Sequence, residues 1–192
     1  MKGRFGFLIG VGIVVVVVLI VVGVFWGIYN TLVTKSQAVD AQWGQVETQY
    51  QRRYDLIPNL VNSVKGIMTQ EQTIFGQISE ARTRYAGATT TDEKAIAGGE
   101  VEATLAKLLV IMENYPTLRS SESVTNLMDE LAGTENRVNV ERRRYNDMVR
   151  DYNTAIKTFP RNMLAGMFGF EAKEYFKSVS GADQAPVVDF SK

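Results

Sequence analysis

The strongest pattern in the chain is an apolar run near its start, where every residue from Phe5 to Ile28 is apolar or glycine. About 20 helical residues cross the hydrocarbon core of a bilayer, so this run spans it with some tilt. Trp26 and Tyr29 stand at the C-terminal edge of the run, and such amphipathic rings favour the headgroup region. The pattern predicts a transmembrane helix over residues 5–28, preceded by a short N-terminal segment of residues 1–4.

A cleaved signal peptide is the alternative interpretation, because Lys2 and Arg4 form a basic segment before the apolar run. The run, however, is longer than the ~7–15 apolar residues of a signal peptide, and no A-x-A-like cleavage site follows it. A retained single-pass anchor in the cell membrane is therefore favoured, with the lipid bilayer as its first partner.

Behind the anchor, apolar residues recur every three or four positions as far as Tyr85. The stripe consists of Val39, Trp43, Val46, Tyr50, Tyr54, Ile57, Val61, Val64, Met68, Phe75, Ile78, Ala81 and Tyr85. This spacing is typical of a helix that buries one face along a neighbour. Glu71 alone interrupts the stripe. Pro58 lies inside it, and because proline removes a backbone donor, we expect a kink or a break there.

Two more helices follow this stripe. The segment GATTT, residues 87–91, reads as a loop, and we expect Thr91 or Asp92 to cap a helix that stops at Pro116. A final long helix is expected after Ser120 or Ser121. Its stripe is Val124, Leu127, Leu131, Val138, Tyr145, Met148, Tyr152, Ile156 and Phe159, and it ends before Pro160.

The predicted fold is all-α, because no strand-like alternation separates these helices. An N-terminal transmembrane helix is followed by an antiparallel bundle of long helices, packed in the manner of a coiled coil, over residues 29–180. The last segment, residues 181–192, is polar and is expected to be flexible.

A short apolar stretch, NMLAGMFGF at residues 162–170, follows Pro160. The favoured interpretation is that it packs over the end of the bundle. The alternative is that its large apolar side chains dip into the membrane interface. Those side chains are Met163, Leu164, Met167, Phe168 and Phe170.

Composition removes several classes of chemistry. The 192 residues include no cysteine and no histidine, which excludes disulfides, thiol nucleophiles, zinc sites built from these residues, and imidazole bases. The 21 basic and 21 acidic residues cancel, so no charge bias points to nucleic acid. Glycine-rich nucleotide loops are absent as well, because Gly98 and Gly99 match no phosphate-binding pattern. No cofactor is expected.

Positive charges flank both ends of the span. Lys2 and Arg4 precede it, and Lys35 follows it closely. Counted locally, the positive-inside rule places the N-terminus in the cytoplasm and the domain outside. Arg52 and Arg53 lie just beyond the usual counting window and reduce this bias, so the side of the domain stays open.

Two small-xxx-small patterns occur in the span, Gly6/Gly10 and Gly23/Gly27. Glycines at this spacing let two helix backbones approach closely, so the patterns favour self-association of the span. Chance occurrence in a segment rich in glycine and valine is the alternative.

Two polar motifs stand among the stripe residues. The first supplies Arg52, Arg53, Asp55 and Asn59, and the second supplies Glu135, Asn136, Arg137, Glu141 and Arg142. Polar side chains in a helical core fix one packing register when they pair with each other. We therefore expect the two motifs to lie side by side and to form an ion-paired structural network across the bundle.

A catalytic alternative uses some of the same carboxylates. Asp55 with Glu135 or Glu141 would make an acid and base pair or a set of oxygen ligands for Mg²⁺ or Ca²⁺. Di-iron bundles also need Glu-x-x-His pairs, which a chain without histidine lacks. The structural network is favoured, and the chain is not expected to be an enzyme.

Three long segments resemble the LemA family. They are QRRYDLIPNLVNSVKG at residues 51–66, GTENRVNVERRRYNDMVRDYN at residues 133–153, and AIKTFPRNMLAGMFGF at residues 155–170. Tyr175 and Phe176 follow the third segment, and residues 87–125 contribute least to the resemblance.

The resemblance implies a membrane-anchored, mainly helical bacterial protein whose larger part forms an antiparallel bundle. No established biochemical activity comes with the family. It also implies a short N-terminus outside the cell and a cytoplasmic domain, which conflicts with the local charge count.

The functional expectation is a membrane-anchored helical scaffold that associates with itself as a homo-oligomer. The alternative is a regulatory adaptor that binds another membrane protein, such as a protease or a signalling component. A metal-dependent enzyme is the third and least favoured interpretation.

Overall fold

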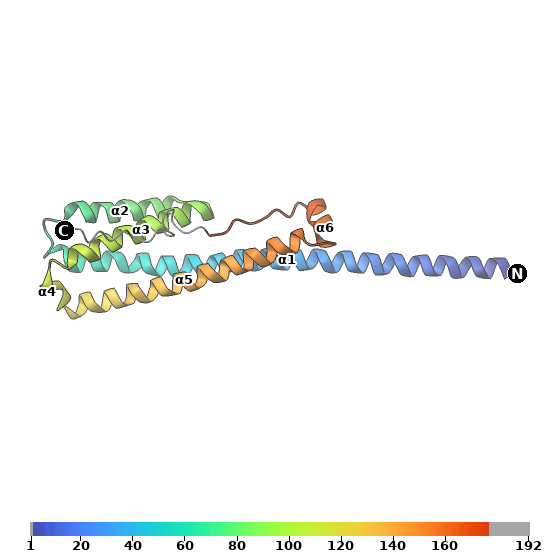
Figure 1. Ribbon diagram of the computed structural model, residues 1–192, viewed down its shortest axis with the longest axis horizontal. Coiled ribbons are helices and arrows are strands. Elements are labelled where there is room, and N and C mark those ends of the chain that lie inside the picture. The colour runs from blue at the N-terminus through green and yellow to red at the C-terminus, as the bar shows by residue number, and fades with distance from the viewer. Residues whose placement is uncertain (1, 177–192) are drawn as a thin grey trace, which may run out of the picture. The chain divides into compact units, whose positions relative to one another are not determined.

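The computed structural model describes residues 2–176 of the chain, and it describes side chains from residue 10 onwards, except for that of Arg119. The elements are the helices α1 (Lys2–Lys65), α2 (Gln72–Gly87), α3 (Thr91–Met112), α4 (Pro116–Arg119), α5 (Glu122–Lys157) and α6 (Arg161–Phe168). No strand occurs between residues 2 and 176. The all-α fold predicted from the sequence is confirmed (Figure 1).

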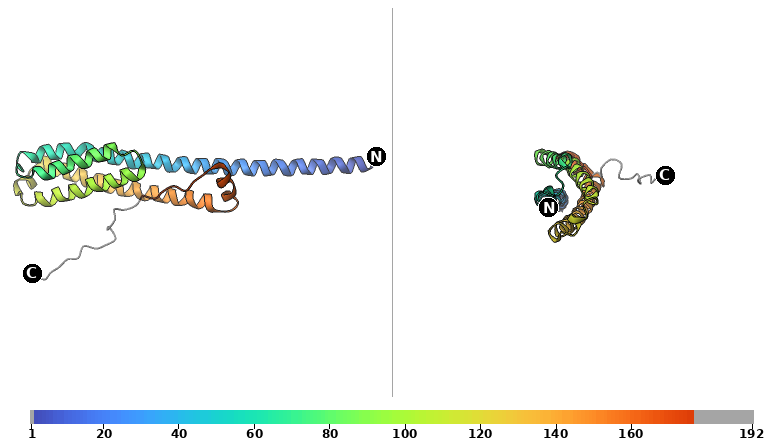
Figure 2. Two further views of the ribbon diagram at one scale, coloured as in Figure 1. Left: turned by 90° about the horizontal axis from the view of Figure 1, so that it is seen from above. Right: turned by 90° about the vertical axis from the view of Figure 1, so that its left-hand side faces the viewer.

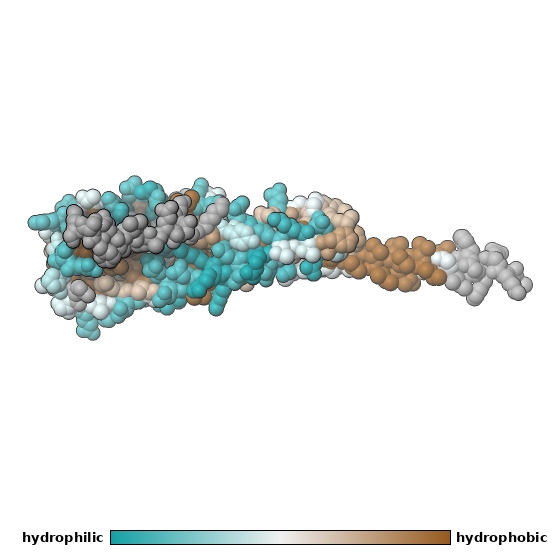
Figure 3. All heavy atoms as spheres, in the orientation of Figure 1, coloured by the Kyte–Doolittle hydropathy of each residue, from teal (hydrophilic) through white to brown (hydrophobic). Residues whose placement is uncertain are grey.

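The predicted transmembrane segment is the first part of α1, and α1 continues without interruption to Lys65. Among the described helices, α1 is the one that is long and apolar enough to cross a membrane. None of its most apolar stretch is buried. Figure 3 shows this stretch as uncovered apolar surface. The anchor and the first helix of the bundle are therefore one element, and the predicted division at residue 29 falls inside it.

The chain divides into two compact units. The first contains residues 2–43 and Tyr145–Tyr175, and so holds the apolar part of α1, the last part of α5 and α6. The second contains Gly44–Arg144 with Phe176, and so holds the rest of α1, all of α2, α3 and α4, and the first part of α5. Each unit has its own core.

The second unit is a bundle whose helices are held together by a continuous apolar interior. In this unit α1 and α5 run antiparallel, because Arg52 meets Glu130 whereas Tyr50 meets Arg142, farther along α5. α2 and α3 form a hairpin beside them (Figure 2). The fully buried side chains of this unit include Tyr50, Ile57, Leu60, Met68, Ile78, Leu108, Met112 and Leu118.

The break in the long predicted stripe comes at Gly66 and not at Pro58. α1 passes through Pro58 with Ile57 and Leu60 fully buried on either side, and this packing outweighs the backbone hydrogen bond that proline removes. The chain turns after Lys65, where the amide of Met68 donates to the Val64 carbonyl at 2.9 Å. Of the kink or break expected at Pro58, the break is wrong, because the helix continues to Lys65. The apolar stripe continues across the turn because Met68 is buried there.

The start of α3 also differs from the sequence prediction by one residue. Thr90, and not Thr91 or Asp92, is the N-cap, because its hydroxyl accepts from the Glu93 amide at 3.2 Å. The Glu93 carboxylate in turn accepts from the Thr90 amide at 3.1 Å. This reciprocal capping box satisfies amides that the first helical turn leaves free. At its other end, α3 stops at Met112, and Pro116 begins α4.

In the first unit, an extended segment after α6 lies along α5. Tyr145 donates its hydroxyl to the Glu174 carbonyl at 3.1 Å, and Tyr152 donates to the Glu171 carbonyl at 3.0 Å. Asn153 holds both sides of the Lys173 backbone: its amide donates to the carbonyl, and its oxygen accepts from the amide, each at 2.9 Å. Side chains of α5 thus take the place of a neighbouring strand for this segment.

Replacing Asn153 by alanine is expected to release this segment. The substitution leaves the backbone amide and carbonyl of Lys173 without their partner at position 153, which is buried. We expect this loss to lower the free energy of unfolding by about 1–3 kcal/mol. Hydrogen exchange at the Lys173 amide should accelerate in the variant. Thr154→Ala, at an exposed neighbouring position, is the control and should leave that exchange rate unchanged.

Candidate functional site

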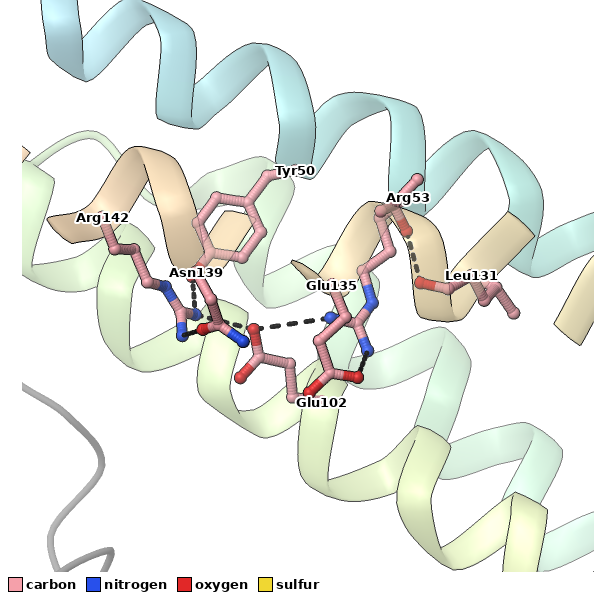
Figure 4. A network of polar contacts seen from close by, with 8 residues as sticks. Tyr50, Arg53, Glu102, Leu131, Glu135, Asn139 and Arg142 are labelled. Atoms are coloured by element: carbon pink, nitrogen blue, oxygen red, sulfur yellow. Dashed lines mark hydrogen bonds and ion pairs between the residues drawn. The ribbon is translucent and has the colours of Figure 1, made fainter. Parts of the chain in front are cut away.

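A network of charged side chains lies in the second unit, where α1, α3 and α5 meet, with Arg53 buried and Glu135 exposed at its edge (Figure 4). Arg53 of α1 is only 4% exposed. Its guanidinium lies 3.6 Å from the carboxylate of Glu102 on α3 and 3.4 Å from the carboxylate of Glu135 on α5. An arginine side chain this deeply buried needs such partners, because removing a lone charge from water is costly.

Arg142 of α5 reaches the same carboxylate from the other side. Its Nη2 lies 2.6 Å from Glu102 Oε1 and also donates to the Tyr50 hydroxyl. The guanidinium lies 5.2 Å from the centre of the Tyr50 ring and 4.4 Å from that of Phe176. Glu102 therefore joins two arginines from two different helices, and with Glu135 the four charges cancel within the network.

A cluster of tyrosines adjoins this network. The ring centres of Tyr50 and Tyr85 lie 5.5 Å apart, and those of Tyr54 and Tyr85 lie 4.2 Å apart. Burial raises the pKa of Tyr50 to about 12, although Arg142 opposes the shift. Burial also raises the pKa values of Tyr54 and Tyr85, so all three hydroxyls stay protonated above pH 10, where an exposed tyrosine ionises.

The structure brings together only part of the set that the sequence predicted. Arg53, Glu135 and Arg142 belong to the network. Arg52 forms a separate, exposed ion pair with Glu130 at 3.4 Å. The remaining predicted members of the first motif, Asp55 and Asn59, are exposed, and so are Asn136 and Arg137 of the second. Asp55 accepts from Gln51 within α1, and Glu141 pairs with Arg144 within α5.

Two members of the network were not predicted from the sequence. Tyr50 was expected to pack in the apolar stripe, and its hydroxyl turns out to be a partner of Arg142. Glu102 lies in the region that resembles the family least, and its neighbours Val101 and Leu105 are buried apolar residues one helical turn apart. A carboxylate next to a buried stripe was the available signal, but it does not reveal which arginine it meets.

The carboxylates of the catalytic alternative do not converge. Asp55, Glu135 and Glu141 each have a different partner, namely Gln51, Arg53 and Arg144. Among the residues that the structure describes, no group of three or more acidic side chains is placed to hold a metal ion. The network is arranged to join helices, since each charge is matched by an opposite charge on another helix.

Comparison with known proteins agrees with the fold and the sequence motifs. The model of the LemA family matches residues 42–190, well over half of the chain. The chain belongs to the LemA family. Its resemblance to this family in the polar motifs is thereby confirmed.

Curated relatives of this LemA-family chain carry magnetosome names. The proteins named Magnetosome protein MamQ 1 and MamQ 2 of Paramagnetospirillum magneticum are each 29% identical to it, over 83% of this chain and 68% of theirs. Magnetosome protein MamQ of Magnetospirillum gryphiswaldense is 27% identical with the same coverage. Together with the apolar part of α1, family membership supports a membrane-associated protein.

The described glycines of the predicted span have free space around them. An added Cβ at Gly10, Gly23 or Gly27 would meet nothing within 4 Å, while the side-chain surroundings of Gly6 lie outside the described part. These positions are accessible to a second helix, and their role in packing stays a prediction.

The tyrosine cluster predicts that the bundle loses stability in alkali. An unfolded tyrosine ionises near pH 10, whereas the folded pKa of Tyr50 is about 12, so between these values the unfolded chain binds fewer protons. The contribution of Tyr50 to the free energy of unfolding is therefore fully present below pH 10. It is lost as the pH rises to 12, which lowers the free energy of unfolding by about 2–3 kcal/mol. Urea unfolding of the full chain in detergent at stepped pH measures this slope. Tyr50→Phe should make the slope shallower, and an unchanged slope would contradict the assignment.

Proposed function

We propose that this LemA-family protein is a membrane-anchored helical scaffold that associates with copies of itself and has no catalytic activity. Three features support the proposal: α1 leads from the apolar segment into the bundle without interruption, the buried charges are matched internally, and the bundle carries an unpaired apolar face. The names of the curated relatives point to a cellular structure and not to a reaction.

The observation that carries the proposal is an exposed apolar stripe on α3. Ile96 and Val110 are 67% and 64% exposed, and Ala103 and Ala106 between them are exposed too. These residues follow one another after seven, three and four positions, which is the spacing of a coiled-coil seam. The small alanines at its centre let a second helix approach closely. The same stripe on another copy is its natural partner, because a two-fold dimer pairs identical surfaces.

The chain contains no cysteine, so a single introduced thiol tests this contact cleanly. Ala103→Cys in the full-length protein in native membranes is expected to form a disulfide-linked dimer on mild oxidation. Asn126→Cys, at an exposed position on α5, is the matched control and should stay monomeric. Light scattering of the unmodified protein in mild detergent should show a discrete oligomer.

Monomer in both measurements would overturn the scaffold proposal. The adaptor interpretation predicts that result together with a different membrane protein recovered at substoichiometric amount in a mild-detergent pull-down. The stripe on α3 would then be the surface that such a partner binds, and Ala103→Arg should abolish its recovery.

A further inference from the structure

We infer that α6 is a second membrane contact: its outer face and the adjoining Phe159 lie in the lipid interface of the leaflet where the span ends. This inference rests on the proposed membrane anchoring of α1. All of the residues involved belong to the first unit.

The first support is the two-sided character of α6. Leu164 and Ala165 are only 2% and 3% exposed, so the inner face is packed within the unit. The outer face carries Met163 and Met167, one helical turn apart and 64% and 69% exposed. Just before the helix, Phe159 is 74% exposed, although it was predicted to belong to the buried stripe of α5. Large apolar side chains gathered at one exposed place are typical of a surface that contacts another protein or a membrane.

The second support is the position of α6 along α1. The ring of Phe168 lies edge-on to that of Tyr29 with centres 5.0 Å apart, and the ring of Phe170 lies 5.8 Å from the same tyrosine. Gly169, at φ +71°, makes the turn that returns Phe170 toward Tyr29. Tyr29 directly follows the apolar run, so the contact places the end of α6 at the depth where the span leaves the hydrocarbon.

The third support is an apolar groove between the two helices. Val22, Phe25 and Trp26 of the span line it together with Tyr29 and Phe168. Val22 lies seven residues before Tyr29, which is about 10 Å along a helix, so the groove opens toward the hydrocarbon side of Tyr29. A lipid acyl chain matches such a groove in both chemistry and depth.

Basic side chains beside this apolar face also favour contact with a membrane. Lys157 and Arg161 flank the apolar face, the former exposed and the latter partly so. Long basic side chains at this level reach lipid headgroups while their stems rest on apolar surface. The outer face of α6 therefore contacts the lipid bilayer and not a second copy of the chain.

Spin labels on single cysteines test this inference in the full-length protein reconstituted into phosphatidylcholine–phosphatidylglycerol vesicles. Oxygen concentrates in hydrocarbon and a nickel chelate stays in water, so the ratio of their collision rates with the label reports its depth. Met163→Cys and Met167→Cys labels are expected to show a ratio nearer to that of a Phe25→Cys label in the span than to that of a label in water. A Gln37→Cys label is the matched control, because Gln37 is exposed and lies eight residues beyond Tyr29, about 12 Å along α1.

Each other outcome has a distinct meaning. If the α6 labels resemble the Gln37 label while the Phe25 label is in lipid, the inference fails and the anchoring stands. If the Phe25 label is also in water, the proposed anchoring itself fails. Labels on α6 shielded from both reagents would show that protein covers the face, which overturns the inference, and spin–spin broadening would identify that protein as a second copy.

Discussion

Replacing Glu102 by alanine is expected to lower the free energy of unfolding of the bundle by about 2–4 kcal/mol. The variant leaves Arg53 and Arg142 facing each other across the site without the carboxylate that separates them. Breaking a buried ion pair by removing one partner is far more costly than the pair is worth, because the remaining charge stays desolvated. Glu102 keeps some contact with solvent, so the loss lies below that of a fully enclosed pair.

Urea unfolding of the full-length protein in a mild non-ionic detergent, followed by far-UV circular dichroism, measures this loss. Glu130→Ala is the matched control, because its pair with Arg52 joins the same two helices as the Arg53–Glu135 pair but is exposed on both sides. An exposed pair contributes about 0–1 kcal/mol. Equal losses in the two variants would show that burial of the network contributes nothing.

A further variant separates charge from shape. Glu102→Gln keeps the size of the side chain and one acceptor oxygen but removes the negative charge. It should lose nearly as much stability as Glu102→Ala if the effect comes from removing the negative charge between Arg142 and Arg53, of which only Arg53 keeps another carboxylate, Glu135. A loss near that of Glu130→Ala would instead assign the effect of the alanine variant to packing.

The helices themselves could be predicted from the sequence because their signals are local. The apolar run, the three-and-four spacing and the stop before Pro160 each depend on neighbouring residues, and they predict α3, α5 and the helical character of the chain through α1 and α2. The stop at Gly66 was missed because Met68 and Phe75 continue the stripe across the turn. The spacing of apolar residues indicates which positions are buried, so a buried turn between two helices can show the same spacing as a continuous helix.

The candidate site could be predicted only where its partners came from two long, recognisable motifs. The two motifs were expected to lie side by side; the structure places Arg53 of the first 3.4 Å from Glu135 of the second, on the facing helices α1 and α5. Glu102 enters from α3, and its register is set by how the α2–α3 hairpin packs. That packing depends on contacts between residues far apart in the chain, which spacing within one helix does not encode.

The role of Gly98 likewise could not be predicted from the sequence, and substitutions at this position are expected to have a large effect on stability. In the sequence it belongs to a pair of glycines with no recognisable motif, whereas in the structure α3 approaches Tyr50 at this point. A Cβ added to Gly98 would lie 2.9 Å from the Tyr50 ring and hydroxyl. The Tyr50 side chain thus fills the space that a Cβ at this position of α3 would occupy, and the cost of glycine in helix propensity is the consequence.

Gly98→Leu is expected to destabilise the bundle by about 3 kcal/mol, and Gly98→Ala by about 1 kcal/mol after its gain in helix propensity. The Tyr50 ring has little freedom to move aside, because it is fully buried, bonded to Arg142 and packed against Tyr85. Its displacement would also disturb the hydrogen bond that positions Arg142. Urea unfolding measured as for the Glu102 variants gives both values.

Gly76→Ala is the matched control, since Gly76 is exposed within α2 and an added Cβ there meets nothing within 4 Å. This variant should gain about 0.5–1 kcal/mol from propensity alone, so the two alanine substitutions are expected to differ in sign. In a Tyr50→Ala background the obstacle is gone, and Gly98→Ala should then stabilise the bundle as Gly76→Ala does. If Gly98→Ala is stabilising with Tyr50 present, the tyrosine yields without cost and the close approach does not fix the register of α3 on α1.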